Sequence, residues 1–195
     1  MNNLLESCFG YDTLKMSVNV NHSDRETICN VAQFKPFYDN YRASLSNLDL
    51  FLTENHLSVT GSFPQFLTGQ NVQVSSISEL KNGIEILSDT LHLGFSDAYI
   101  SRIDIATTIE TDFSPHRYFE FLGNLGRCER NPIKKTTLQY TKGTKNNGLY
   151  KLMFYDKGKE LQKGKKKILA NDNLLRIESR LEKKTIKAIA VPLSN

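Results

Sequence analysis

The sequence predicts an α+β fold with a largely antiparallel central sheet and helices packed on one of its faces. Three observations predict it. Several short segments alternate apolar and polar residues, which is typical of half-buried strands. One longer segment carries apolar residues at helical spacing behind a capping signal. The expected succession of strands and helices indicates one domain in which neighbouring strands pair as antiparallel partners.

The N-terminal segment, residues 1–56, is expected to contribute a strand and a helix to that domain. Residues 14–20 alternate apolar with polar and predict the first strand. Residues 21–55 are polar and mixed, and we expect a helix over residues 37–52. Residues 57–62 predict the next strand, and the glycines and proline that follow end it.

The strongest helix signal begins at Ser76. Ser76 as the N-cap and Glu79 three residues later form a capping box. Apolar residues then recur at helical spacing up to a stop near Gly94, and these are expected to be core: Ile77, Leu80, Ile84, Leu87 and Leu91.

The C-terminal half predicts four more strands. Residues 99–108 form one, and a short helix follows between Ser114 and Gly123. Residues 136–141 and 148–156 predict a hairpin. Residues 174–181 are the last strand. The core of the domain is expected to span residues 57–187, followed by a tail at residues 188–195.

Charge is distributed unevenly along the chain. Residues 1–126 hold 7 Lys/Arg and 15 Asp/Glu, whereas residues 127–195 hold 18 Lys/Arg and 6 Asp/Glu, which together give the net charge of +4. A concentrated positive field suits a polyanionic partner such as nucleic acid. The alternative for the lysine run at 163–167 is a solvated surface. No apolar run is long enough to span a membrane, and three separated cysteines favour free thiols in a reducing cytoplasm.

Two predicted strands place a carboxylate beside arginine on one face. Alternate side chains of a strand point to the same side, so Asp104 shares a face with Arg102, and Glu178 shares one with Arg176 and Arg180. If the strands are neighbours, the two carboxylates can bind one divalent cation through oxygen. The alternative is cross-strand ion pairing between these carboxylates and arginines.

A tyrosine near the end of the second strand of the hairpin is followed by several charged residues. Tyr155 is followed by Asp156, Lys157, Lys159 and Glu160. A phenol is a poor nucleophile until it is deprotonated and its anionic target is neutralised, which such neighbours can assist. The alternative is a strand tyrosine that is half buried.

Other catalytic signatures are missing from the sequence. The four histidines include no His-x-His and no helical i, i+4 pair. Neither the sequence of a serine nucleophile elbow nor a phosphate-binding GxxxxGK[ST] loop is present. Serine hydrolysis and ATP hydrolysis are therefore not expected.

Three blocks resemble one protein family in their order and spacing. They are Ile100–Asp104, Lys151–Glu160 and Leu175–Leu181, and Gly69–Val72 is a further match. The blocks resemble those of phage and plasmid replication-initiation proteins of the filamentous-phage gene II/X type. The resemblance covers residues 57–187.

The resemblance implies a rolling-circle replication initiator with a relaxase-like fold, which nicks DNA at a specific site and depends on a divalent metal ion (Mg²⁺ or Mn²⁺). It assigns the nucleophile to Tyr155, which would leave a 5′-phosphotyrosine link and a free 3′-hydroxyl primer. Metal ligands would fall on Asp104 and Glu178, with Glu160 as a third candidate. Lys157 would lie by the scissile phosphate. Many related relaxases use a His-x-His metal motif, which is missing here, so the carboxylates must replace it.

Basic residues are expected to neutralise DNA phosphates. Tyr140 and Tyr150 are expected either to stack on bases or to pack the hairpin. The predicted DNA-binding residues are Arg102, Lys142, Lys145, Lys151, Lys163, Lys165, Lys166, Lys167, Arg176 and Arg180.

The expected partners are origin DNA (single-stranded or an extruded hairpin), host helicase and polymerase, and a second copy of the chain in a homodimer. The expected location is the cytoplasm of a bacterial host, without a membrane. Relatives usually continue beyond the last block, so the tail is either truncated or the end of a short form. Two alternatives remain: a non-catalytic origin-binding regulator, and an RNA-binding module.

Overall fold

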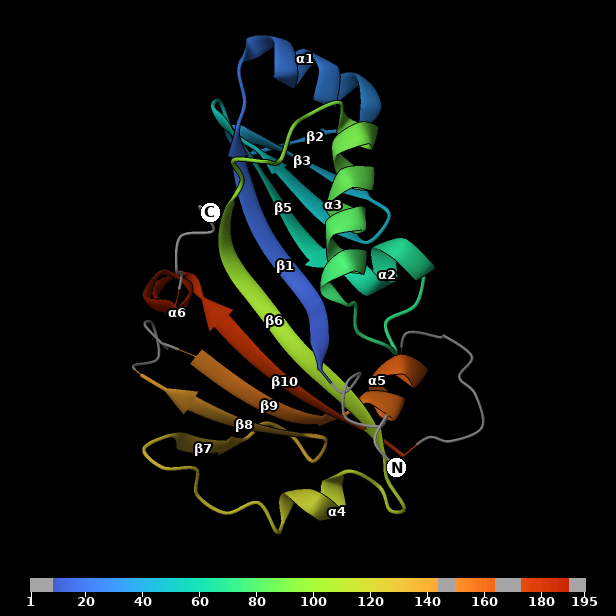
Figure 1. Cartoon of the computed structure of the whole chain (residues 1–195), viewed down its shortest axis with the longest axis vertical. Helices are drawn as coiled ribbons and strands as arrows, with labels where there is room; N and C mark the ends of the chain where they lie inside the picture. The colour runs from blue at the N-terminus through green and yellow to red at the C-terminus, as the bar shows by residue number, and fades with distance from the viewer. Residues whose placement is uncertain (1–8, 144–149, 164–172, 190–195) are drawn as a thin grey trace. The chain divides into compact units, whose positions relative to one another are not determined.

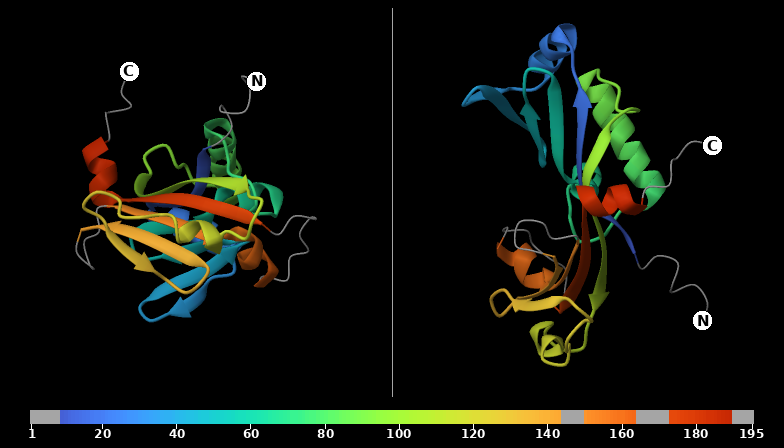
Figure 2. Two further views of the ribbon diagram at one scale, coloured as in Figure 1. Left: turned by 90° about the horizontal axis from the view of Figure 1, so that it is seen from below. Right: turned by 90° about the vertical axis from the view of Figure 1, so that its left-hand side faces the viewer.

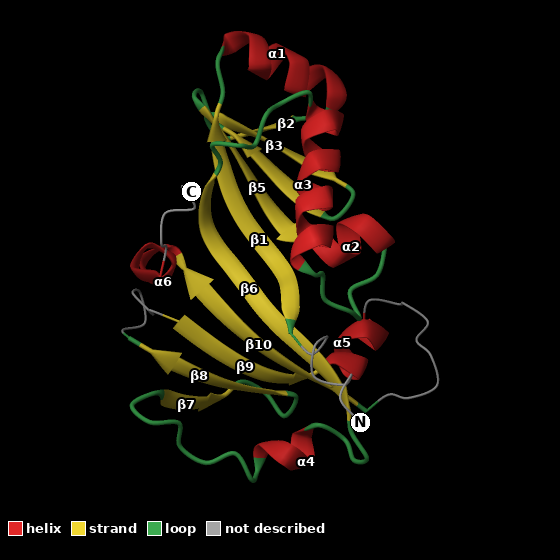
Figure 3. Ribbon diagram, viewed as in Figure 1, coloured by secondary structure: helices red, strands yellow, loops and turns green. Residues whose placement is uncertain are grey.

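The structure, a computed structural model, describes residues 9–143, 150–163 and 173–189. Within these ranges the chain forms ten strands and six helices, with antiparallel pairing at every described register (Figures 1 and 3). This confirms the predicted α+β class. No helix in these ranges is long and apolar enough to cross a membrane.

The strands are β1 (Gly10–Asn19), β2 (Lys35–Phe37), β3 (Asn40–Leu45), β4 (Leu48–Leu52), β5 (His56–Ser62), β6 (Tyr99–Glu110), β7 (Glu129–Pro132), β8 (Thr137–Lys142), β9 (Tyr150–Asp156) and β10 (Leu174–Glu182). The helices are α1 (His22–Val31), α2 (Phe63–Thr68), α3 (Ile77–Leu91), α4 (His116–Phe119), α5 (Lys157–Lys163) and α6 (Lys183–Ile189).

The chain divides into two compact units. Unit 1 comprises residues 1–10, 72–74 and 104–195, and unit 2 comprises residues 11–71 and 75–103. Residues 11–56 of the predicted N-terminal segment and most of the first part of the predicted core thus share unit 2. The functional division expected at residues 56 and 57 stays a prediction.

Unit 2 is a sheet whose apolar face packs against helices. Its strand order is β2-β3-β4-β5-β1-β6. Leu14 and Met16 of β1 and Val59 of β5 are buried together with Leu87 and Leu91 of α3. The capping box predicted at the start of α3 is confirmed.

The predicted helix over residues 37–52 is wrong. These residues form the end of β2 and all of β3 and β4. Leu48, Leu50 and Leu52 are buried in alternation, which is the period of a strand. Tyr38 and Ser46 adopt positive φ angles of 53° and 54°, which is the turn geometry that joins the three strands.

Two further expectations for unit 2 need correction. The polar region 21–55 also contains α1, which begins at the N-cap Asn21 with Asp24 completing a capping box. Ile77, expected in the core, is 53% exposed, because it is the first residue of α3 and lies off the buried stripe. Ile84 is partly buried against the core, and Leu80 is buried as expected.

Unit 1 is a sheet with strand order β6-β10-β9-β8-β7, in which β6 contributes residues 104–110 (Figure 1). The predicted hairpin is confirmed as β8 and β9, and the last predicted strand as β10. One face of the sheet is apolar, with Leu138, Tyr140 and Leu175 packed against Phe119 of α4. The other face carries the ionisable side chains and Tyr155, and we call it the tyrosine face.

Candidate active site

Tyr155 lies near the end of β9, between two neighbouring strands. In the antiparallel register it is opposite Arg176 of β10 and Thr137 of β8. Residues paired in this way share a face of the sheet. The alternation of side chains therefore places Glu178 and Arg180 on the tyrosine face as well, as the sequence predicted.

The Tyr155 hydroxyl donates a hydrogen bond to Glu178. Its oxygen lies 2.9 Å from Glu178 Oε2. Tyr155 is half buried, and the Glu178 side chain is only 6% exposed. A carboxylate held at this distance from a phenol can accept its proton.

Arg180 joins Glu178 to Asp104. Its Nε lies 3.2 Å from both Asp104 oxygens, and its Nη2 lies 3.1 Å from Asp104 Oδ2 and 3.3 Å from Glu178 Oε1. The Asp104 side chain is 1% exposed and that of Arg180 is 22% exposed. The cross-strand ion pairing considered from the sequence is thus present for Arg180, and it brings the two carboxylates to one guanidinium.

Lys157 lies on the other side of Tyr155. Its side chain is fully buried, and Nζ lies 5.8 Å from the centre of the Tyr155 ring. Nζ also donates to Glu160 Oε2 at 3.1 Å, and Glu160 is half exposed. A cation above the ring interacts favourably with the aromatic face and with negative charge on the phenolate oxygen.

Asp156 explains why the chain turns into a helix directly after Tyr155. Its Oδ1 accepts a hydrogen bond from the Lys159 backbone N–H at 2.9 Å, and its Oδ2 lies 3.3 Å from Lys159 Nζ. This is the bonding of a helix N-cap. The cap starts α5 at the end of β9 (Figures 1 and 2) and so positions Lys157 beside the tyrosine.

Arg176 is placed for structure rather than for solvent contact. Its side chain is fully buried, and Nη1 donates to the Val72 carbonyl at 3.0 Å and to Thr108 Oγ1 at 2.8 Å. Val72 belongs to a short segment of unit 1, residues 72–74. The burial of Arg176 does not favour its predicted contact with DNA.

The predicted metal ligands divide into two places. Asp104 and Glu178 both accept hydrogen bonds from Arg180, whereas the Glu160 carboxylate accepts one from Lys157 Nζ. In the described part of the chain, no group of three or more His, Cys, Asp or Glu residues is placed to hold a metal ion. Mg²⁺ commonly binds through one or two carboxylates together with substrate phosphates and water, so Asp104 and Glu178 fit its chemistry. A cation there would compete with Arg180 for the same oxygens.

The predicted DNA-binding residues are spread over both units. Lys142 is exposed at the end of β8, and Lys151 is half buried opposite Arg180. Arg102 belongs to unit 2. Four predicted residues lie outside the described ranges, as does the side chain of a fifth: Lys145, Lys165, Lys166, Lys167 and, by its side chain, Lys163.

Of the two hairpin tyrosines, Tyr140 has a described side chain. Tyr140 is 2% exposed, and its hydroxyl donates to the carbonyls of Leu122 and Gly123. It therefore packs the hairpin and is not available for stacking on a base. The side chain of Tyr150 lies outside the described residues.

Sequence reasoning missed a groove in unit 1 beside α4. It has a volume of about 460 Å³, and its floor is Phe119, Pro132 and Leu138. We call it the α4 groove. Its polar lining is His116, Glu120, Arg130, Lys134, Lys135 and Thr137. The signal available from the sequence was the adjacent pair of lysines in the turn before β8.

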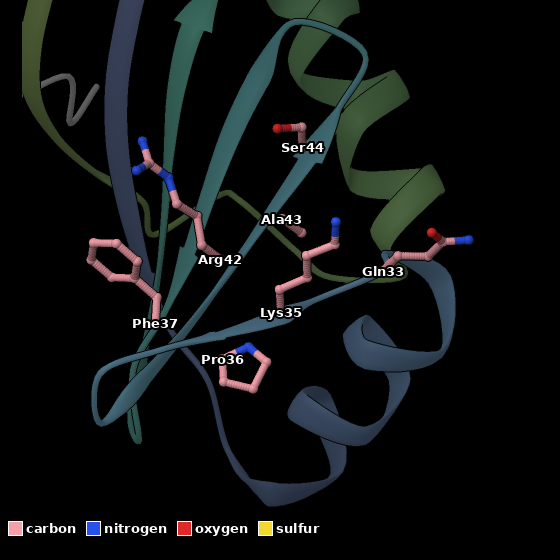
Figure 4. Close-up of a pocket in the computed structure, with 7 residues that line it drawn as sticks. All are labelled: Gln33, Lys35, Pro36, Phe37, Arg42, Ala43 and Ser44. Atoms are coloured by element: carbon pink, nitrogen blue, oxygen red, sulfur yellow. The ribbon is translucent and has the colours of Figure 1, made fainter.

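A second hollow, in unit 2, lies on the β2–β3 hairpin (Figure 4). Its volume is about 420 Å³, and it is lined by Lys35, Phe37 and Arg42 among others. The Arg42 guanidinium lies 5.6 Å from the Phe37 ring centre and 3.1 Å from Asp49. These contacts hold the hairpin side chains against one another, and we assign this hollow no function.

Comparison with known proteins identifies the family. The family of the replication-associated gene II protein, represented by its N-terminal region, matches residues 11–194. A search for similar curated proteins found no match. A solved structure of a rolling circle replication initiator protein from Geobacillus stearothermophilus aligns over 95% of this chain and 81% of its own, with 12% identity and a TM-score of 0.44, a likeness too weak to assign fold or function. Since the family match spans nearly the whole chain, the chain belongs to the family of replication-associated gene II proteins, as its sequence blocks predicted.

Proposed function

We propose that this chain initiates rolling-circle replication by nicking one DNA strand through tyrosine transesterification. Membership of the replication-associated gene II protein family supports a role in DNA replication. The observation that carries the chemistry is the 2.9 Å hydrogen bond from the Tyr155 hydroxyl to Glu178, on a face that also holds Asp104 and Arg180. A half-buried phenol with a carboxylate acceptor has the arrangement of an activated nucleophile.

In the proposed reaction, the Tyr155 oxygen attacks the phosphorus of a phosphodiester as its proton passes to Glu178. The bond between phosphorus and the 3′ oxygen breaks, and that oxygen takes up a proton from water to become a free 3′-hydroxyl. The 5′ phosphate stays attached to Tyr155. No oxidant or second substrate is needed, because one phosphodiester is exchanged for another.

Positive charge assists this reaction from both sides of the tyrosine. Lys157 lies over the ring of Tyr155 and would stabilise the phenolate. Glu160 would position Lys157 through the 3.1 Å contact between them. Arg180, partly exposed on the same face, is suited to contact the phosphate when DNA is present. Lys151, opposite Arg180, is expected to add to that contact.

Asp104 and Glu178 are the residues that would hold a divalent ion such as Mg²⁺ or Mn²⁺. Such an ion would withdraw negative charge from the scissile phosphate. The contacts of Arg180 with both carboxylates support their grouping. Because the guanidinium occupies oxygens of both carboxylates and offsets part of their charge, we propose that the ion binds most tightly when DNA phosphate draws Arg180 away.

The experiment is to incubate the purified chain with origin-containing single-stranded DNA and Mg²⁺ or Mn²⁺, and to look for a covalent protein–DNA adduct. We expect an adduct with the wild-type chain and none with Tyr155→Phe. A matched control is Tyr140→Phe, which removes a hydroxyl that donates to two backbone carbonyls of unit 1. An undiminished adduct from Tyr155→Phe would exclude Tyr155 as the nucleophile.

The same assay separates the alternatives. A non-catalytic origin-binding regulator would bind the DNA with strong salt dependence and form no adduct. An RNA-binding module would prefer RNA of matched sequence and require no metal ion. Recruitment of host helicase and polymerase, and pairing of two copies of the chain, remain part of the proposal that the adduct assay does not address.

A further inference from the structure

The α4 groove is a basic hollow next to the end of the strand that carries Tyr155. Its lining contains one acidic residue, Glu120. The basic residues of the lining are His116, Arg130, Lys134 and Lys135. Its volume of about 460 Å³ lies in the range of pockets that hold small ligands. Its composition favours an anion with an apolar portion.

Hydrogen bonds attach this groove to the end of β9. Thr137, which lines the groove, pairs in register with Tyr155. The Asp156 N–H donates to the Thr136 carbonyl at 3.1 Å, and the Ile133 N–H donates to the Thr137 carbonyl at 2.8 Å. The turn that carries the two lysines is therefore anchored one residue from the nucleophile.

The walls of the groove are held in place by Arg130. Its Nε donates to the Leu122 carbonyl at 3.0 Å, and its Nη2 donates to the Phe119 carbonyl at 2.9 Å. These bonds fix the segment after α4 against β7. Phe119 is 8% exposed and Leu138 is 1% exposed, so the floor is part of the packed core of unit 1. A charged rim beside the exposed Pro132, over this rigid base, is suited to a nucleotide, whose phosphate is anionic and whose sugar and base have apolar faces.

We propose that the α4 groove binds single-stranded DNA adjacent to the nucleotide that reacts with Tyr155. Lys134 and Lys135 contact backbone phosphates, and the exposed Pro132 packs against the sugar and base. This inference rests on the proposed function for the identity of the strand. The lining of the groove includes residues from both faces at the start of β8, because Thr137 pairs with Tyr155 and Leu138 pairs with Phe154. The bound strand therefore passes around the start of β8 instead of lying only on the tyrosine face.

The test measures the affinity of the full chain for fluorescein-labelled oligothymidylate, and it does not require the DNA to be nicked. Lys134→Ala/Lys135→Ala should weaken binding on the order of tenfold at low salt and reduce the slope of log K against log[salt] by about 1.4, the value for two phosphate contacts on a single strand. The matched control is Lys183→Ala/Lys184→Ala, which removes the same charge from two exposed residues of α6 in the same unit. The control should lower the affinity and the slope much less.

Acetylation of lysines in the wild-type chain gives an independent measurement. Bound oligothymidylate should protect Lys134 and Lys135 from acetylation and leave Lys183 and Lys184 reactive. Equal losses of affinity in the two double variants, or equal protection of both pairs, would overturn the proposal. Binding of oligothymidylate requires no nicking, so such a result would not change the outcome of the Tyr155 adduct test. Failure to form the adduct would, in turn, not change the measured binding of oligothymidylate to the groove.

Discussion

The two units of this chain build similar sheets but use the second face of the sheet differently. Both bury an apolar face against helices. In unit 2 the opposite face carries Ser17 and Ser58, whose hydroxyls lie 3.3 Å apart, and the exposed pair of Arg42 and Asp49. In unit 1 it carries Asp104 and Glu178, which are almost fully buried around one arginine.

That difference supports the location of the proposed chemistry in unit 1. Burying a charged group costs several kcal/mol per ion, even when the group is paired. Replacing a buried ion pair by well-packed hydrophobic residues often leaves the stability unchanged or raises it by roughly 1–4 kcal/mol. Stability alone does not explain the buried charges of unit 1, which is consistent with the site proposed there. The charge follows the same division, since unit 1 contains 19 Lys/Arg and 11 Asp/Glu, and unit 2 contains 6 and 10.

The largest effect is expected from removing the proton acceptor in unit 1. Glu178→Gln keeps the shape of the side chain but can neither take the Tyr155 proton nor offer a carboxylate to the proposed divalent ion. We expect the rate of adduct formation to fall by roughly 10²–10⁴-fold, the usual contribution of general base catalysis. Single-turnover kinetics would measure it, with Glu129→Gln on exposed β7 as the control. A Glu178→Gln rate equal to that of the control would remove Glu178 from the reaction.

A core truncation in unit 2 should change stability but not chemistry. Leu50 is fully buried in unit 2, and Leu50→Ala should lower the free energy of unfolding by about 2–5 kcal/mol. The adduct rate per folded molecule should stay at the wild-type value, because the contacts described for the site come from unit 1. Urea titration and single-turnover kinetics would measure the two quantities. A folded Leu50→Ala chain that forms no adduct would end the functional distinction between the units.

Arg180 offers a sharper test of the metal site. If the guanidinium and a divalent ion compete for Asp104 and Glu178, Arg180→Gln should tighten Mn²⁺ binding in the absence of DNA, by about tenfold for a difference of ~1.4 kcal/mol. Electron paramagnetic resonance of free Mn²⁺ would measure the affinity. Lys151→Gln, on the same face, is the control. Weaker binding in Arg180→Gln would show that the arginine supports the ion rather than competing with it.

The smallest effect is expected at the start of α3 in unit 2. Ser76→Ala should cost about 1 kcal/mol of stability through the lost N-cap.

Hydrogen bonds from the Ser76 N–H at 2.7 Å and its hydroxyl at 2.8 Å lower the pKa of Glu79 below its usual value of 4.5. A lowered pKa in the folded state means that Glu79 stabilises the fold above about pH 4.5 and loses this contribution as the pH falls.

Unfolding measured against pH would test this. The difference in stability between wild type and Glu79→Gln should shrink on acidification. Glu85→Gln, which removes an exposed carboxylate from the middle of the same helix, provides the control for charge. An equal pH dependence in the two variants would contradict the role assigned to the capping box.

Local patterns predicted the elements whose signals are contained within a few residues. The alternation at 14–20, the capping box at Ser76 and the hairpin that contains Tyr155 each predicted the correct element, because period and capping depend on near neighbours. The region 37–52 was misread as one helix, because its three short strands are stabilised by pairing with β5 and with one another, which no local pattern records. The short helices α2 and α5 were missed for a related reason, since helices of 6 and 7 residues depend on packing and capping for stability.

The sequence by itself determined the family, the fold class and the faces on which Tyr155, Glu178 and Asp104 lie, because side-chain alternation in a strand requires no partner. Only the tertiary structure decided which of these residues meet. Strand register brought Tyr155 to Glu178 and joined Asp104 to Glu178 through Arg180, whereas Glu160 meets Lys157 through a local contact within α5. Strand register also buried Arg176 and formed the α4 groove. These outcomes of register depend on pairing between segments far apart in the chain, and spacing along the chain does not specify that pairing.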